Sequence, residues 1–230
     1  MPAGDETAVV EIRVRVLALA GEAARREELL AAITPDEAAR RLRFRREEDR
    51  ARFLLGRATL RQEVGRALGL PPRDVPLAAS ESGKPVVAGG ALEVNVSHAG
   101  DVVLVALARG AAIGVDVEQL DPRYAGDPGV PLSRRELGDL AALPPDLRLR
   151  GFFHAWTAKE AIVKAVGTGL GLPLDSFDVS VDPRRPPALL AARHPALAAP
   201  LSLAPIAVPA GHVAAAAAVA PACAVRYSRP

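Results

Sequence analysis

The stretch Phe152-Phe-His-Ala-Trp-Thr-Ala-Lys-Glu-Ala-Ile-Val-Lys-Ala-Val-Gly-Thr-Gly-Leu-Gly171 has the pattern of one helix followed by a glycine-rich exit. Its apolar residues recur at helical spacing, which predicts an amphipathic helix packed on a core, capped at Gly167. Glu160 and Lys164 are four residues apart and stack at one edge of the apolar stripe, whereas Lys159 points into it. Alone, this pattern is more typical of an ordinary core helix than of a functional site.

A second motif, Ile113-Gly-Val-Asp-Val-Glu118, changes that balance. Strand alternation sends its apolar residues to one face and Gly114, Asp116 and Glu118 to the other. Two carboxylates held side by side are costly without a cation between them. Oxygen ligands without cysteine partners favour a hard ion, Mg²⁺ first. The alternative is a strand end that carries two solvated acids.

Composition bounds the class of protein. The chain has 230 residues, half of them hydrophobic, and a formal net charge of +2. This is enough for one large domain or two small ones, and the charge balance does not call for nucleic acid. The single cysteine, Cys223, excludes an intramolecular disulfide and suits a reducing compartment. With neither a signal peptide nor a membrane-spanning segment in the sequence, we expect a cytoplasmic protein without membrane contact.

Periodicity along the chain predicts an α+β fold. Apolar or alternating runs predict strands at residues 9–17, 92–96, 102–108, 113–117, 177–181, 188–191 and 213–219. Helical patterns predict helices at 21–33, after the N-cap Thr34, at 47–68 and at 133–143. The arginines of the 47–68 helix are expected mostly on a solvated face. The alanine-rich run near 213 favours a helix by propensity, but Ala210-Gly-His-Val echoes Ala99-Gly-Asp-Val, which indicates a strand and an internal duplication with its seam near 111–114.

Two further short motifs carry polar groups. Lys84 lies rigidly between Gly83 and Pro85, and His98 follows Ser97 at a strand end. Each alone is more often structural. Together with the carboxylates and the Glu–Lys helical pair, they suit a magnesium-bound pyrophosphate and a phosphoryl-type transfer. The chain has no Walker A pattern and no dinucleotide-binding fingerprint.

The motifs at 83–85, 95–98, 113–118 and 156–161, in that order, resemble the Sfp-type 4′-phosphopantetheinyl transferases. The likeness also includes Lys164 and residues 33–35, 52–56, 169–174 and 176–177, so it covers most of the chain. Gly-Val-Asp-Val-Glu paired with Trp-x-x-Lys-Glu-Ala is specific, whereas either motif alone is weak.

The resemblance implies a fold and a reaction. The fold would be two similar α/β halves, 1–112 and 113–230, related by a pseudo-twofold axis with the active site at their interface. The first half would carry coenzyme A phosphate-binding elements, and the second the metal site and catalytic helix. Coenzyme A and Mg²⁺ would bind in the cleft of a monomer. The enzyme would move 4′-phosphopantetheine to a serine of an apo acyl or peptidyl carrier protein and release adenosine 3′,5′-bisphosphate.

The resemblance also implies site residues. Asp116, Glu118 and Glu160 would hold the metal, with Glu160 also the candidate base and Lys164 assisting the leaving phosphate. Coenzyme A, chiefly its phosphates, would be held by Arg40, Arg52, Lys84, Ser97, His98, Lys159 and Lys164. One departure is Glu37, which stands where relatives place a basic residue after Thr-Pro-x. The grip on the 3′-phosphate would then be weaker, or rebuilt from Arg40, Arg41 or Arg43.

Other functions remain open at this point. An inactive relative that only binds carrier proteins or coenzyme A is disfavoured, because Asp116, Glu118, Glu160 and Lys164 are all present. An unrelated magnesium-dependent phosphotransferase would act without coenzyme A. The smaller trimeric holo-synthases are disfavoured because this chain contains both halves. The sequence does not say whether the carrier serves fatty-acid, polyketide or nonribosomal peptide synthesis; residues 119–143 are expected to contact it.

Overall fold

The computed structural model describes residues 9–80, 83–124 and 132–228. Its helices are α1 (Glu22–Ala32), α2 (Pro35–Arg41), α3 (Glu47–Leu68), α4 (Arg134–Ala142) and α5 (Pro145–Val166). Its strands are β1 (Val10–Ala18), β2 (Leu77–Ala79), β3 (Pro85–Val87), β4 (Glu93–Ala99), β5 (Val102–Ala108), β6 (Ile113–Gln119), β7 (Phe177–Val179), β8 (Leu189–Ala192), β9 (Ser202–Pro205), β10 (His212–Ala218) and β11 (Cys223–Tyr227). The α+β class is therefore confirmed.

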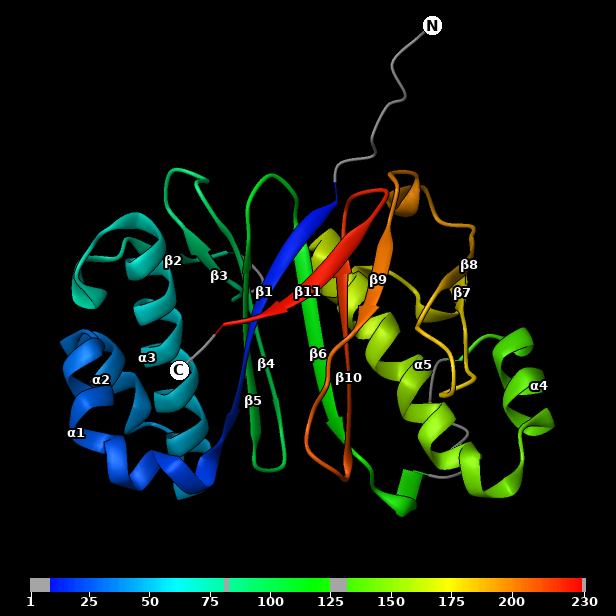
Figure 1. The fold of residues 1–230 in the computed structure, drawn as a ribbon, viewed down its shortest axis with the longest axis horizontal. Coiled ribbons are helices and arrows are strands. Elements are labelled where there is room, and N and C mark those ends of the chain that lie inside the picture. Colours follow the sequence, from blue (N-terminus) through cyan, green and yellow to red (C-terminus); the bar gives the residue numbers. More distant parts are fainter. Residues whose placement is uncertain (1–8, 81–82, 125–131, 229–230) are drawn as a thin grey trace, which may run out of the picture.

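Two sheets form the centre of the molecule, and helices cover their outer faces (Figure 1). The larger sheet has the order β11-β1-β5-β4 and the smaller the order β6-β10-β9. Helices α1 and α3 pack on the larger sheet around Leu54 and Val105, and α5 packs on the smaller one around Ile162. A third apolar cluster lies between the sheets. The chain thus forms two sheet-and-helix halves, each with one 22-residue helix.

The alanine-rich run forms strand β10, as its echo of the earlier strand predicts. Its alternate residues serve two interfaces: Ala214, Ala216 and Ala218 pack between the sheets, while Ala215 and Ala217 pack with α5. β10 is the middle strand of its sheet, between β6 and β9. Small side chains at these positions let a helix and a second sheet approach from both sides, so tertiary packing overrides helical propensity.

The last strand crosses between the halves. β11 pairs in parallel with β1, from Val10 opposite Cys223 to Val14 opposite Tyr227. The end of the chain therefore completes the sheet of the first half. A division into 1–112 and 113–230 leaves out this exchange, which no local sequence pattern signals. None of the described helices is long and apolar enough to cross a membrane.

Candidate active site

The centre of the site is formed where α5 faces β6. Trp156, Glu160 and Lys164 recur every four residues and lie along one side of α5. Opposite them on β6, Asp116 Oδ1 accepts a hydrogen bond from Lys164 Nζ at 2.6 Å, and Glu118 Oε1 accepts one from Trp156 Nε1 at 3.2 Å. The alternation expected for β6 is confirmed, and it sets the two carboxylates against the helix.

Gly114 allows α5 to lie this close to β6. A Cβ atom at this position would come 2.1 Å from Ala161 O and 2.5 Å from Ala165 N, both backbone atoms of α5. No real contact is that short, so any larger residue would push the helix away. The glycine of the Gly-Val-Asp-Val-Glu motif thus sets the distance between the carboxylates and the residues of α5.

Side chains of β4 bond to the edge of β6 that does not pair with β10. Asn95 Oδ1 accepts a hydrogen bond from the amide of Val115 at 2.9 Å. Ser97 Oγ donates to Asp116 Oδ1 at 2.8 Å and accepts from Lys164 Nζ at 3.2 Å. Ser97 is itself buried. Its hydroxyl therefore orients the carboxylate of Asp116 in the wall of the site.

The three carboxylates share an environment that favours their neutral forms. Burial raises the pKa of Glu118 to about 7, and the nearby charge of Asp116 adds to the shift. Burial also raises the pKa of Asp116, against the opposing effect of Lys164. The pKa of Glu160 is raised first by burial and then by Asp116. Close carboxylates that resist ionisation together form a site that a cation would stabilise.

A magnesium ion fits the donor set, although no metal cage is preformed. Asp116 Oδ2 is buried and has no hydrogen-bond partner, which leaves a carboxylate oxygen available to a cation. Glu118 and Glu160 are the other oxygen donors beside it. Within 9–80, 83–124 and 132–228, however, no three acidic, histidine or cysteine side chains are grouped closely enough to hold a metal. The ammonium of Lys164 supplies the positive charge next to Asp116 instead.

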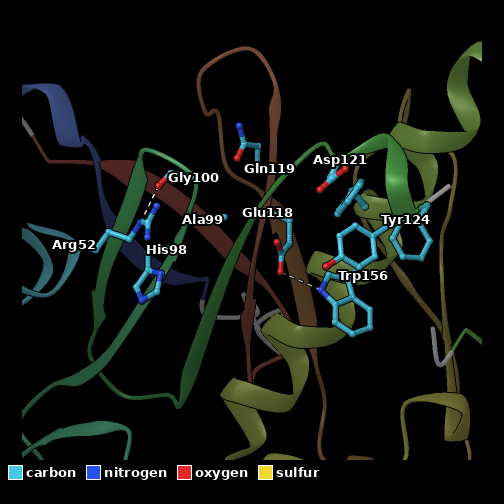
Figure 2. A pocket seen from close by; sticks show the side chains of 11 residues that line it. Arg52, His98, Ala99, Gly100, Glu118, Gln119, Asp121, Tyr124 and Trp156 are labelled. Atoms are coloured by element: carbon cyan, nitrogen blue, oxygen red, sulfur yellow. Dashed lines mark hydrogen bonds between the residues drawn. The ribbon is translucent and has the colours of Figure 1, made fainter. Parts of the chain in front are cut away.

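Three cavities meet around this centre. The first, called here the tryptophan cavity, has a volume of about 430 Å³ and is lined by Glu118, Trp156, Tyr124, Arg52 and His98 among others. In Figure 2, Glu118 bonds to Trp156 on one side of it, and Arg52 and His98 lie on the other. Arg52 also donates to Gly100 O, which fixes the guanidinium at the rim.

The second cavity, called here the basic cavity, adjoins the first at Arg52 and His98. Its volume is about 270 Å³, and Arg40 and Arg57 also line it. Both of these guanidinium groups lie over the ring of Phe53, at 5.6 and 5.8 Å from its centroid. Burial lowers the pKa of His98, and the charge of Arg52 lowers it further. Such a concentration of cations is stabilised by an anion.

The third cavity, called here the lysine cavity, adjoins the basic cavity at Pro85 and Val96 and has a volume of about 570 Å³. Lys84, Asn95, Glu160 and Lys164 provide its polar side chains, and its remaining wall is largely apolar. Lys84 Nζ donates to Ile113 O at 2.9 Å and to Lys164 O at 3.1 Å. An ammonium has three donors, so one remains for a ligand.

The structure corrects the expectation that Lys159 holds coenzyme A. Its side chain is fully buried, and Nζ lies 2.8 Å from Glu136 Oε2 on the side of α5 that faces α4 and β7. The backbone carbonyls of Leu174 and Phe177 accept its other hydrogen bonds. A lysine with all three donors used inside the core has no proton donor left for a phosphate.

The solvated-face interpretation of the α3 arginines is also wrong. Arg61 is 4 % exposed and donates to Glu37 Oε2 at 2.6 Å as well as to three backbone carbonyls. Arg57 lines the basic cavity, with Nε at 3.6 Å from Glu37 Oε1. Glu37 also closes the capping box of α2 with Thr34. The departure at Glu37 is thus a structural acid that holds two arginines of α3. The four-residue spacing of Arg57 and Arg61 was the available signal.

Carboxylates lie on one wall of the cleft and several arginines on the other, an arrangement that suits a phosphorylated ligand. Two family profiles match the chain: "4′-phosphopantetheinyl transferase, N-terminal" over residues 22–109 and "4′-phosphopantetheinyl transferase superfamily" over residues 112–217. The chain belongs to the 4′-phosphopantetheinyl transferases and is an enzyme of the Sfp type.

Individual relatives agree with the profiles. The 4′-phosphopantetheinyl transferase Sfp of Bacillus subtilis (strain 168) is 34 % identical over 66 % of this chain and 68 % of its own length. HetI of Nostoc sp., also a 4′-phosphopantetheinyl transferase, is 34 % identical over 70 % of each chain. The L-aminoadipate-semialdehyde dehydrogenase-phosphopantetheinyl transferase of Mus musculus is 28 % identical over 69 % of this chain and 57 % of its own.

Proposed function

We propose that this enzyme transfers 4′-phosphopantetheine from coenzyme A to a serine of an apo acyl or peptidyl carrier protein, with Mg²⁺, and releases adenosine 3′,5′-bisphosphate. The observation that carries the proposal is the junction of the three cavities. There, the facing residues of α5 and β6 lie next to a cavity lined by Arg40, Arg52, Arg57 and His98. Carboxylates and cations placed side by side suit a pyrophosphate and the atoms that react with it.

Coenzyme A would occupy the cleft with its phosphates near the cations. We assign its 3′-phosphate to the basic cavity, since an added anion relieves the repulsion among Arg40, Arg52 and Arg57, which Asp49 and Glu37 offset only in part, and can accept a hydrogen bond from His98. Lys164 and the free donor of Lys84 are then available to the pyrophosphate or the groups beside it. Ser97 acts mainly by orienting Asp116, to which its hydroxyl is bonded.

Glu160 and Lys164 are assigned the proton and charge transfers. The serine oxygen attacks the phosphorus that carries pantetheine, its proton passes to Glu160, and the bond to the adenosine bisphosphate oxygen breaks. Glu160 has no hydrogen bond or ion pair with the described residues, and its raised pKa makes it a better base near neutral pH. Lys164 provides a charged hydrogen bond for the leaving phosphate.

The metal is assigned to Asp116, Glu118 and Glu160. Asp116 Oδ2 is the oxygen without a partner, and Glu118 is held in place by Trp156. When bound, Mg²⁺ would supply charge neutralisation for the pyrophosphate. Lys164 now neutralises Asp116, so the proposal requires this ammonium to share the carboxylate or turn toward the substrate.

At the level of the molecule, we propose two halves related by a pseudo-twofold axis, with the site between them. Support comes from the two profiles, which divide between residues 109 and 112. We also propose a cytoplasmic monomer. Carrier contacts are proposed for 119–143, of which 125–131 lie outside the described residues.

The test is to incubate the enzyme with coenzyme A, Mg²⁺ and several apo carrier proteins, and to determine the carrier masses. One carrier should gain the mass of a single phosphopantetheine group, lost again when its serine is replaced by alanine. Absence of any gain with carriers of all three pathway types would contradict the proposal. The carrier that reacts fastest would identify the pathway.

A further inference from the structure

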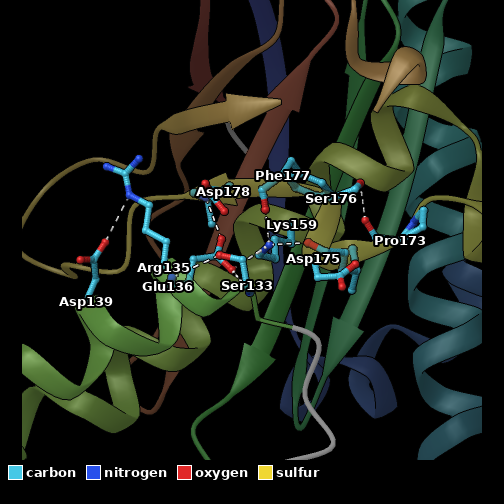
Figure 3. Close-up of polar contacts among 12 residues, drawn as sticks. Ser133, Arg135, Glu136, Asp139, Lys159, Pro173, Asp175, Ser176, Phe177 and Asp178 are labelled. Carbon is cyan, nitrogen blue, oxygen red and sulfur yellow. Dashed lines mark hydrogen bonds and ion pairs between the residues drawn. The ribbon is translucent and has the colours of Figure 1, made fainter. Parts of the chain in front are cut away.

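A buried ion pair lies on the side of α5 away from the carboxylates. Lys159 and Glu136 both have side chains that are 0 % exposed, and Nζ lies 2.8 Å from Oε2. Figure 3 shows the pair between α4, α5 and the segment that leads into β7. The ammonium also lies 4.4 Å from the centroid of the Phe177 ring.

The pair joins four segments of the second half. Glu136 accepts from the amide of Ser133 at the start of α4 and from the amide of Val179 in β7, each at 2.7 Å. Lys159 donates to Phe177 O at 2.7 Å and to Leu174 O, just before β7. The two charged groups thus satisfy backbone groups of α4, β7 and the 3₁₀ turn that precedes β7, and they tie these to α5.

The connection reaches the site on both sides. Glu160 follows Lys159 directly, so its side chain leaves the helix roughly 100° around the axis, toward the cleft. Leu174, whose carbonyl accepts from Lys159, also lines the lysine cavity together with Lys164. Rotation or sliding of α5 would therefore move Glu160 and Lys164 relative to the carboxylates of β6.

Stability alone is a poor explanation for such a pair. Desolvation of two charges offsets most of their attraction, and replacing both by uncharged groups of similar size is often neutral. Removing only one partner is strongly destabilising, because the other charge stays buried alone. What a fully bonded pair does provide is one specific arrangement of the elements that it joins.

We propose that the Glu136–Lys159 pair positions α5 and thereby holds Glu160 and Lys164 in register with Asp116 and Glu118. Glu136 is then a positioning residue for the transfer, and Lys159, within the Trp-x-x-Lys-Glu-Ala motif, serves it from the core. The inference rests on the roles proposed above for Glu160 and Lys164.

Two variants separate positioning from stability. Glu136→Gln leaves Lys159 buried without a countercharge and should lower Tm by about 10 °C. Adding Lys159→Met removes the second charge, so Tm should recover part of the loss. Recovery should be incomplete, because the amides of Ser133 and Val179 donate to different oxygens of Glu136 and the side chain introduced by Glu136→Gln keeps only one acceptor. Turnover should stay at least about tenfold below wild type in both variants, with KM for coenzyme A changed less than about threefold. Where the double variant does not fold, Glu136→Gln/Lys159→Gln replaces it.

A second readout does not need activity. Trp156 is the only tryptophan of the chain and lies on α5, bonded to Glu118. In the double variant its emission should shift and its quenching by acrylamide should increase, because the helix no longer holds its register. The control is Arg135→Gln/Asp139→Asn, which removes an exposed ion pair of α4 at 3.7 Å and should leave turnover and emission unchanged.

Recovery of turnover together with Tm, and an unchanged emission, would overturn the positioning role and leave a purely structural pair. If the wild-type enzyme transferred no phosphopantetheine, the proposed function would fail, and the tryptophan readout would still decide whether the pair holds α5. Failure of the two ideas is therefore distinguishable.

Discussion

Glu160 differs from the other carboxylates of the site at the level of single contacts. Asp116 is bonded to Lys164 and Ser97, and Glu118 to Trp156, whereas Glu160 has no partner among the described residues. An acid that is half-buried, unpaired and raised in pKa is free to accept a proton. The geometry thus favours Glu160 as the base over Asp116 or Glu118.

Replacing Glu160 by Gln therefore separates binding from chemistry. The amide keeps the shape and one oxygen, so coenzyme A should bind within about tenfold of wild type, or about 1.4 kcal/mol. Turnover should fall at least about a hundredfold, since the amide cannot take the proton of the serine. Calorimetric titration with coenzyme A and timed carrier modification provide the two numbers. A parallel fall of binding and turnover, restored by excess Mg²⁺, would show a metal ligand instead.

Arg52 tests the basic cavity in a similar way. Its guanidinium is shared by the basic and tryptophan cavities and is held by Gly100 O and Asp49. We expect coenzyme A to bind more tightly than its 3′-dephospho form, and Arg52→Ala to narrow that preference about tenfold. Arg66→Ala is the control, because it removes an exposed arginine of the same helix outside the three cavities of the site. Equal affinity of the wild type for both ligands would refute the assignment of the 3′-phosphate.

At the scale of the elements, the contact between α5 and β6 leaves no room for a larger side chain at Gly114. The Cβ of an alanine at 114 would overlap backbone atoms of α5 and come 2.8 Å from Lys164 Cβ. Gly114→Ala should destabilise the fold by about 1–3 kcal/mol and lower turnover more than this loss explains, because α5 carries Glu160 and Lys164. The matched control is Gly138→Ala in α4, where a Cβ meets nothing within 4 Å and the exposed helix should gain slightly in stability. The measurements are the denaturant midpoint and the turnover of each variant. Equal stability of the Gly114→Ala and Gly138→Ala proteins would show that α5 can shift freely.

The same elements show what local patterns can and cannot predict. Alternation along β6 and the four-residue spacing on α5 put Asp116, Glu118, Glu160 and Lys164 on the right faces, because each face follows from a single element. The same spacing places Lys159 correctly in the core. Its partner Glu136 lies on another helix, so the periodicity of one element cannot predict the pair. Arg57 lines the basic cavity and β11 pairs with β1, and both features depend on tertiary contacts that a local pattern does not predict.

For the whole molecule, the acidic centre predicts how stability depends on pH. Glu118 has a folded-state pKa of about 7 against an ordinary value of 4.5. Between these values the folded state holds the proton more often than the unfolded state, so the free energy of unfolding decreases as pH rises through this window. Arg193 holds the pKa of Asp178 well below its ordinary range. The stability that the ionised Asp178 contributes is therefore lost as pH falls, so Asp178 has the opposite effect to Glu118, and only at acidic pH.

Mg²⁺ should reverse the trend, because it binds the ionised carboxylates and only the folded state brings them together. In chelator, Tm should fall between about pH 6.5 and about pH 8, above the window in which the lowered pKa values of His98 and His154 act in the opposite direction, and Glu118→Gln should flatten that slope. With excess Mg²⁺, the rise in Tm should be larger at the higher pH, and larger in wild type than in the variant. Thermal unfolding at the two pH values, with and without Mg²⁺, gives four Tm values for the wild type and four for the variant. A Mg²⁺-induced rise that is the same at both pH values and in both proteins would place the ion away from Glu118.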